Sequence, residues 1–121
     1  MEQAASRLDV RLKRAYSPPS PEDGVRVLVD RLWPRGLRKS DAAIDLWLKE
    51  AAPSNELRRC FGHDPRRWEE FRRRYRAELS SNAALVDELR AIARKRRLTL
   101  VYAARDELHN QAVVLRDILA E

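Results

Sequence analysis

Residues 25–32 read Val-Arg-Val-Leu-Val-Asp-Arg-Leu, a run that is mostly apolar and rich in β-branched side chains. Such a run is typical of a strand inside a sheet that is buried on both faces. Residues 33–36, Trp-Pro-Arg-Gly, end it, because a proline restricts the residue before it and a glycine permits a tight turn. Residues 98–104, Leu-Thr-Leu-Val-Tyr-Ala-Ala, predict a second buried strand. Two buried strands with helical sequence between them predict an α/β domain.

An earlier segment, residues 8–16, alternates apolar and polar side chains and predicts a half-buried strand. The loop that follows, 17–24, carries three prolines. At eight residues it is short for the crossover that joins parallel strands, so the residues alone favour an antiparallel first pair. The long helical stretch before residue 98 fits a parallel crossover, which should be right-handed.

Helix signals are strongest in the middle of the chain. Ser54 is a suitable N-cap for a helix over 55–61, and Gly62 is a suitable stop. Asp64 and Pro65 predict a second start, with the aspartate as N-cap and the proline in the first turn. That helix should run to about residue 79, with a buried stripe of Trp68, Phe71, Tyr75 and Leu79.

Three further helices are expected. Residues 82–95 form one, with Leu85, Leu89 and Ile92 inward. Asp106 can cap a last helix over about 107–120, with Leu108, Ala112, Leu115 and Leu119 inward. Residues 44–52 fit a short helix around Trp47. These elements predict a small three-layer α/β domain with a short central sheet flanked by about four to five helices. It is expected to span 1–121 as a single domain, with 1–7 a loose N-terminal tail.

The charge is strongly basic and uneven. The net charge is +6, which favours anionic partners without choosing among them. Residues 58–76 hold eight arginines against three acids, whereas residues 106–121 hold one arginine against four acids. The single cysteine fits a reducing compartment, and neither a secretory signal nor an apolar run of membrane-spanning length is visible. A cytoplasmic location without membrane contact is therefore expected.

Four blocks of sequence together resemble a known family. The first is Asp-Arg-Leu-Trp-Pro-Arg-Gly-Leu at 30–37, followed by Lys39. The second is Asp-Leu-Trp-Leu-Lys at 45–49 with Ala-Pro-Ser at 52–54. The third is Leu-Arg at 57–58 and Phe-Gly-His-Asp-Pro at 61–65, with Trp68, Phe71, Tyr75 and Glu78-Leu79. The fourth is the 98–104 strand with Asn110 and Ala112.

Over roughly residues 8–119 the chain resembles the YeaO-like branch of the bacterial family called domain of unknown function 488. The family has no settled activity, so the resemblance implies a fold and not a reaction. It implies an α/β sandwich whose first two strands are parallel, hence a mainly parallel central sheet. Cys60 departs from the larger, often aromatic residue expected there, which speaks against a role as nucleophile.

The candidate ligand site lies at the carboxyl ends of the strands, where open α/β sheets bind ligands. Arg31 and Arg35 offer forked donors suited to phosphate or carboxylate, and Lys39 adds a point charge. Trp33 and Tyr102 are expected to form a wall. The remaining candidate ligand-binding residues are Gly36, Arg105 and Asn110, the last near a helix start. The alternative is that Arg31 pairs internally with Asp30, Asp45 or Glu78, and that Trp33 belongs to the core.

His63 and Asp64 are the candidate acid/base pair, since a carboxylate can orient an imidazole. The alternative is that Asp64 is only an N-cap and His63 a loop residue. Two histidines and one cysteine lack metal-ligand spacing, so no metal is expected, and no glycine-rich phosphate motif points to a cofactor. Cys60 is interpreted as a buried, inert thiol, and Ser54 as a cap.

Three functions remain open from the sequence. The first is a domain, with or without catalysis, that binds an anionic or nucleotide-like small molecule at the strand ends. The second is a nucleic-acid-binding module whose arginine-rich helices follow phosphates, although exposed stacking aromatics are expected to be scarce. The third is an interaction domain for an acidic protein partner. A monomer or a weak homodimer is compatible with each.

Overall fold

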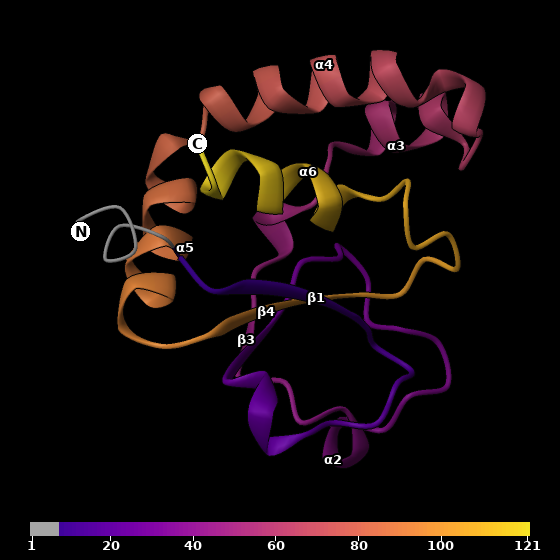
Figure 1. Ribbon diagram of the computed structural model, residues 1–121. Helices are drawn as coiled ribbons and strands as arrows, with labels where there is room; N and C mark the ends of the chain where they lie inside the picture. The colour runs from indigo at the N-terminus through magenta and orange to yellow at the C-terminus, as the bar shows by residue number, and fades with distance from the viewer. Residues whose placement is uncertain (1–7) are drawn as a thin grey trace.

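A four-stranded parallel sheet forms the centre of the computed structural model, which describes residues 8–121. Its strands are β1 (Val10–Arg14), β2 (Val25–Leu28), β3 (Leu46–Trp47) and β4 (Leu98–Tyr102). Their order is β1-β4-β2-β3, and every neighbouring pair is parallel. Figure 1 shows the pair β1 and β4 side by side. The two predicted buried strands are the two central ones, and the tail predicted for 1–7 lies outside the described residues.

The antiparallel first pair that the short loop favoured is wrong. Strands β1 and β2 do not pair with each other, because β4 lies between them and pairs with both. The loop over 15–24 therefore skips one strand position, and it does so with only a 3-10 turn, η1 (Pro21–Asp23). The parallel direction that the family resemblance implied is confirmed.

Helices lie on both faces of the sheet and make three layers. The helices α3 (Asn55–Phe61), α4 (Trp68–Ser80), α5 (Ala83–Lys95) and α6 (Gln111–Leu119) lie over one face (Figure 1). The short helix α2 (Lys39–Ala42) and η1 lie on the other. Two further 3-10 turns, η2 (Lys49–Ala51) and η3 (Pro65–Arg67), precede α3 and α4. None of the helices within residues 8–121 is long and apolar enough to cross a membrane.

The core has a large side and a small side, because successive residues of a strand face opposite ways. Val27, Leu98, Leu100 and Tyr102 face the four large helices and pack with Phe71, Tyr75, Leu89 and Leu115, among others. Leu28 and Val101 face the other way and pack with Ala15, Trp33, Leu37, Ile44 and Trp47. The stripe predicted for α4 is buried at Phe71, Tyr75 and Leu79, while Trp68 is half-buried at its edge.

Two predicted helices differ from the structure. Residues 44–52 form β3 and η2 instead of a helix, because Leu46 and Trp47 pair with β2 and extend the sheet by one strand. The last helix begins at Gln111 and not near 107, because the Asn110 side chain accepts from the N–H groups of Ala112 and Val113 and caps it there. Leu108, predicted to face inward, precedes the helix and is 73% exposed.

The capping roles predicted for Ser54, Gly62 and Asp64 are confirmed, although Asp64 caps the 3-10 turn η3 and the α-helix that follows, α4, begins only at Trp68. The Ser54 hydroxyl accepts from the Leu57 N–H at 3.1 Å, Gly62 ends α3 with a left-handed backbone, and Asp64 accepts from the Arg66 N–H at 3.0 Å. Ser54 also donates its hydroxyl to Glu78 of α4 at 2.6 Å, so one side chain caps α3 and ties it to α4.

Replacing Ser54 with alanine is expected to lower the free energy of unfolding by about 1–2 kcal/mol, the upper part of the range for lost caps, because Glu78 also loses its hydroxyl partner. Urea unfolding measures the change. The matched control is Ser80→Ala, since the Ser80 hydroxyl donates only to the Arg76 carbonyl one turn back on an exposed helix face. An equal loss in the two variants would contradict the structural role of Ser54.

Candidate functional site

A cavity of about 440 Å³ opens at the carboxyl edge of the sheet. Its lining includes a segment or residue that follows each of the four strands: Tyr16, residues 30–35, residues 52–53 and residues 103–104. The helical side of the lining comes from α3, α4 and the start of α6. A cavity therefore lies at the strand ends, where open α/β sheets usually bind ligands.

The cavity brings together part of the set predicted from sequence. Arg31, Trp33, Arg35, His63 and Asn110 line it. Four other predicted ligand-binding residues and one predicted catalytic residue do not: Gly36, Lys39, Tyr102, Arg105 and Asp64.

The local structure shows where the predicted ligand-binding residues that do not line the cavity lie instead. Tyr102 is 3% exposed, because the strand alternation turns its ring into the large core. Lys39 is the first, exposed residue of α2, and Gly36 lies in an exposed turn beyond the cavity. Arg105 is exposed and directly follows Ala104, which lines the cavity.

One nitrogen of the Arg31 guanidinium is hydrogen-bonded, and another is buried without a hydrogen-bond partner. Its Nη2 donates to the carbonyls of Ala52 and Pro53 at 3.4 and 3.5 Å. Its Nε is the one buried side-chain nitrogen or oxygen in residues 8–121 that has no hydrogen-bond partner. A buried donor without an acceptor lowers the stability of a protein by about 1–3 kcal/mol. A bound group that accepts a hydrogen bond from this atom would remove that penalty.

The internal ion pairs considered for Arg31 are not formed within residues 8–121. Each of the three acids has other partners. Asp45 accepts from the Arg26 N–H, and Glu78 accepts from Ser54. Asp30 accepts from the Ala103 N–H at 3.0 Å and from the Gln111 side chain.

Among residues 8–121, Asp30 is the acid that lines the cavity, and its burial changes the pKa of its carboxyl group. Burial raises its pKa to about 6, although hydrogen bonds from Ala103 and Gln111 and the charges of Arg58 and His63 act in the opposite direction. The Trp47 indole donates to the Asp30 carbonyl at 2.7 Å and so fixes the backbone of this residue. The pKa of this carboxyl group therefore lies much closer to neutral pH than that of an ordinary aspartate.

The predicted pair of His63 and Asp64 is not made. The Asp64 carboxylate bonds to the Arg66 side chain and backbone, and these hydrogen bonds lower its pKa. His63 instead lines the cavity with a left-handed backbone, φ 57°, which is uncommon for a residue other than glycine. The alternative of an N-cap beside a loop histidine describes the local structure.

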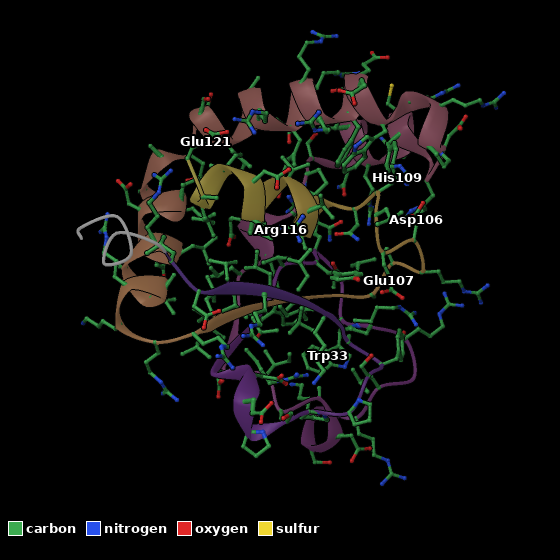
Figure 2. All side chains as sticks on the ribbon, in the orientation of Figure 1. Trp33, Asp106, Glu107, His109, Arg116 and Glu121 are labelled. Carbon is green, nitrogen blue, oxygen red and sulfur yellow. The ribbon has the colours of Figure 1, made fainter. Side chains whose placement is uncertain are left out.

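A different histidine has a carboxylate partner. His109 Nδ1 lies 2.9 Å from Asp106 Oδ2 on the loop that leads to α6, where Figure 2 shows both. Hydrogen bonds from the Leu108 N–H and the His109 ring lower the pKa of Asp106. The rings of His109 and Trp68 also pack in a T-shaped arrangement, with centroids 5.2 Å apart. The pair holds His109 against the wall of the cavity.

Trp33 belongs to both the cavity and the core. Its indole donates to the Leu37 carbonyl at 2.6 Å, and its ring meets Trp47 edge to face with centroids 5.5 Å apart. It packs on the small side of the core and also lines the cavity, so both interpretations from sequence hold in part.

The comparisons with known proteins assign the family. Residues 9–121 match the family described as the inactive DUF488-N3 subclade. The chain belongs to this family. It is 45% identical over 112 residues to the uncharacterized protein YeaO of Escherichia coli K12, covering 93% of this chain and 97% of YeaO. It is 46% identical over 110 residues to an uncharacterized protein of Mycobacterium tuberculosis H37Rv, covering 91% of this chain and 92% of that protein. No solved structure matches.

Several cavity residues of this DUF488-N3 chain escaped the sequence analysis, chiefly Asp30, Arg58, His109 and Gln111. Asp30 had a visible signal, since it is an acid that directly follows a buried apolar run. Arg58 had no such signal in the sequence, because its position at the cavity depends on how α3 packs over the strand ends.

Two further features of this family member concern metal-ligating side chains and Cys60. No group of three or more metal-ligating side chains gathers within residues 8–121. Cys60, interpreted as buried, is exposed, because it lies on the outer side of α3 and its sulfur accepts from Arg74 at 3.3 Å. The inward residues of that helix are Leu57 and Phe61.

Proposed function

We propose that the protein binds an anionic small molecule of about nucleotide size in the strand-end cavity. The observation that carries the proposal is the buried Nε of Arg31, which has no partner among the described residues. Arg31 lines the cavity, and a small turn of its side chain would bring this covered nitrogen to a phosphate or carboxylate oxygen of a ligand, which would supply the missing acceptor. Guanidinium groups are well suited to this, since they bind such anions through paired, charge-assisted hydrogen bonds.

The charge of the lining supports an anionic ligand. Among residues 8–121, three arginines line the cavity, Arg31, Arg35 and Arg58, and the acid in the lining is Asp30. Because burial raises the pKa of Asp30 to about 6, this acid can be protonated, and so neutral, at a pH only slightly below 7. A bound anion favours that proton, since it repels the charged carboxylate.

The size and surface of the cavity support a small organic molecule. A volume of about 440 Å³ lies in the range of small-molecule sites, which is roughly 300–1,000 Å³. The apolar part of the lining gives room for a ring next to the charged group; it comprises Leu32, Trp33, Pro34, Phe61 and Phe71. A phosphorylated metabolite or a mononucleotide combines the two features.

We infer binding without catalysis. The family that the chain matches is described as an inactive subclade, and the acid/base pair expected at 63–64 is not made. The single cysteine favours a reducing compartment, so we place this function in the cytoplasm.

The test is a thermal-shift and calorimetric screen with inorganic phosphate, ribose 5-phosphate and adenosine 5′-monophosphate. A ligand at a hundred times its Kd adds about 2.7 kcal/mol of stability. Arg31→Ala is expected to weaken binding of the best ligand about 10- to 100-fold, because a hydrogen bond to a charged group contributes about 1.5–3 kcal/mol.

The matched control is Arg94→Ala, which removes an equal exposed charge near the end of α5, where the chain enters the amino end of β4. Binding should be unchanged in this variant. Equal affinities in wild type and Arg31→Ala, or an equal loss in Arg94→Ala, would refute an anion site at Arg31.

A further inference from the structure

Two of the three exposed large apolar side chains among the described residues line the strand-end cavity. Among the described residues three large hydrophobic side chains are exposed: Tyr16 (44%), Leu32 (65%) and Leu108 (73%). Tyr16 and Leu32 line the cavity, and Leu108 directly precedes His109, which also lines it. Exposed apolar groups beside a pocket are typical of a surface that contacts a ligand or a partner. A small ligand enclosed in the cavity would not need them.

The ring of Tyr16 is held in place although it is exposed. Its hydroxyl donates to the Arg35 carbonyl at 2.8 Å. The guanidinium of Arg14 lies over the ring, 5.3 Å from its centroid, and Arg14 itself bonds to the Ala103 and Ala104 carbonyls. A fixed, exposed aromatic ring next to cationic groups has the properties of a platform for stacking a nucleic-acid base.

Arginines surround the same mouth on three segments. Arg35 and Arg58 line the cavity and are exposed, and Arg105 follows the lining residue Ala104 and is exposed. Of the four exposed arginines between residues 55 and 67, Arg58 lines the cavity, whereas Arg67 bonds to the Cys60 carbonyl on the outer side of α3. On the opposite loop, over 103–110, the exposed acid is Glu107 (Figure 2). The rim is therefore mainly cationic.

We propose that the cavity takes one nucleotide of a single-stranded nucleic acid, with the neighbouring base on Tyr16 and the neighbouring phosphates on Arg35 and Arg58. The inference rests on the proposed function, since it concerns the same cavity, and it names the larger molecule to which the bound nucleotide belongs. Single-strand sites combine cationic groups with exposed aromatic rings in this way. A base inside a duplex cannot enter such a cavity without leaving its stack.

The experiment measures fluorescence anisotropy with a labelled ten-residue oligothymidylate and uses thymidine 5′-monophosphate as competitor. The oligonucleotide is expected to bind at least tenfold more tightly than the mononucleotide, and its affinity should fall as salt rises. The slope of log K against log salt should approach −0.7 for each phosphate bound. Arg58→Ala should make this slope shallower by about one contact.

Variants at Tyr16 separate stacking from charge. Tyr16→Ala is expected to weaken the oligonucleotide about 5- to 100-fold, the range for loss of one stacked base. The mononucleotide should lose less affinity than the oligonucleotide, because only the oligonucleotide has a second base to stack on the ring. Tyr16→Phe keeps the ring and should retain binding, and Arg94→Ala should bind like wild type because its charge lies at the other edge of the sheet. Thermal melts confirm that each variant is folded.

The outcomes separate this inference from the proposed function. If the mononucleotide binds and the oligonucleotide binds no more tightly, the inference is overturned and the small-molecule function stands. If neither binds, both are overturned. If a ten-residue polyglutamate competes as well as the oligonucleotide, the surface fits an acidic protein and the nucleic-acid assignment is wrong. An equal loss in Arg94→Ala and Arg58→Ala would also overturn it, because binding would then follow net charge alone.

Discussion

Replacing Asp30 with asparagine is expected to stabilise the folded protein above pH 6 and to change its stability little near pH 4. The pKa of Asp30 is about 6 in the folded chain, whereas an unfolded chain has an aspartate pKa of about 3.9. The folded state therefore holds this proton more tightly. Its contribution to stability is fully present below the unfolded pKa and is lost as the pH rises through 6. Two pKa units correspond to about 3 kcal/mol, an upper limit for the gain.

Urea unfolding of wild type and Asp30→Asn at several pH values between 4 and 8 measures this effect. The asparagine keeps an acceptor for the Ala103 N–H, and Gln111 can turn its amide to match. The matched control is Asp64→Asn, where hydrogen bonds from Arg66 lower the pKa of the native carboxylate. That variant should be the less stable one at neutral pH, so the two variants should differ from wild type in opposite directions. Parallel pH profiles for wild type and Asp30→Asn would contradict the buried position of this acid.

Replacing Gly24 with alanine is expected to destabilise the protein by about 3 kcal/mol or more, since strain and a steric clash add. Gly24 has φ 68° and ψ −133°, a backbone conformation that is nearly restricted to glycine. A Cβ there would lie 2.3 Å from the Arg97 carbonyl oxygen, which accepts from the Val25 N–H where β2 and β4 begin to pair. Relief of the clash would separate the two central strands.

Gly36→Ala is the matched control for Gly24→Ala, since Gly36 also has a positive φ, 77°, but a Cβ there meets no atom within 4 Å. Strain alone should cost about 1–2 kcal/mol in that variant. Thermal and urea unfolding of both variants gives the comparison. Similar losses in the two would show that the approach to Arg97 does not matter.

Local chemistry in the sequence predicted much of the fold. The apolar runs at 25–32 and 98–104 gave the central strands, because burial on both faces leaves a clear pattern in composition. The sequence also predicted where helical segments begin and end, because a cap acts within three or four residues; the residues are Ser54, Gly62 and Asp64. Strand order was not predictable from such local signals. It depends on β4 pairing with two strands that lie about seventy or more residues earlier in the chain.

The candidate site was predictable to the extent that it follows the strand ends. The rule for open α/β sheets found Arg31, Trp33 and Arg35, which directly follow a central strand. The prediction that Tyr102 lines the site was wrong. Tyr102 is the last residue of β4, and the alternation of side chains along the strand turns its ring into the core. Arg58 was missed because tertiary packing, and not sequence distance, brings α3 over the strand ends.

The most direct test of the central claim is a titration of ¹⁵N-labelled protein with adenosine 5′-monophosphate, followed by amide chemical shifts. An anion site at the strand ends predicts the largest changes at Arg31, His63, Ala103 and Ala104, and their loss in Arg31→Ala. A second, smaller cavity of about 190 Å³ lies between α4, α5 and the end of α6 and includes Arg76 and Arg90. Changes confined to those two residues, or no saturable change at all, would contradict the assignment.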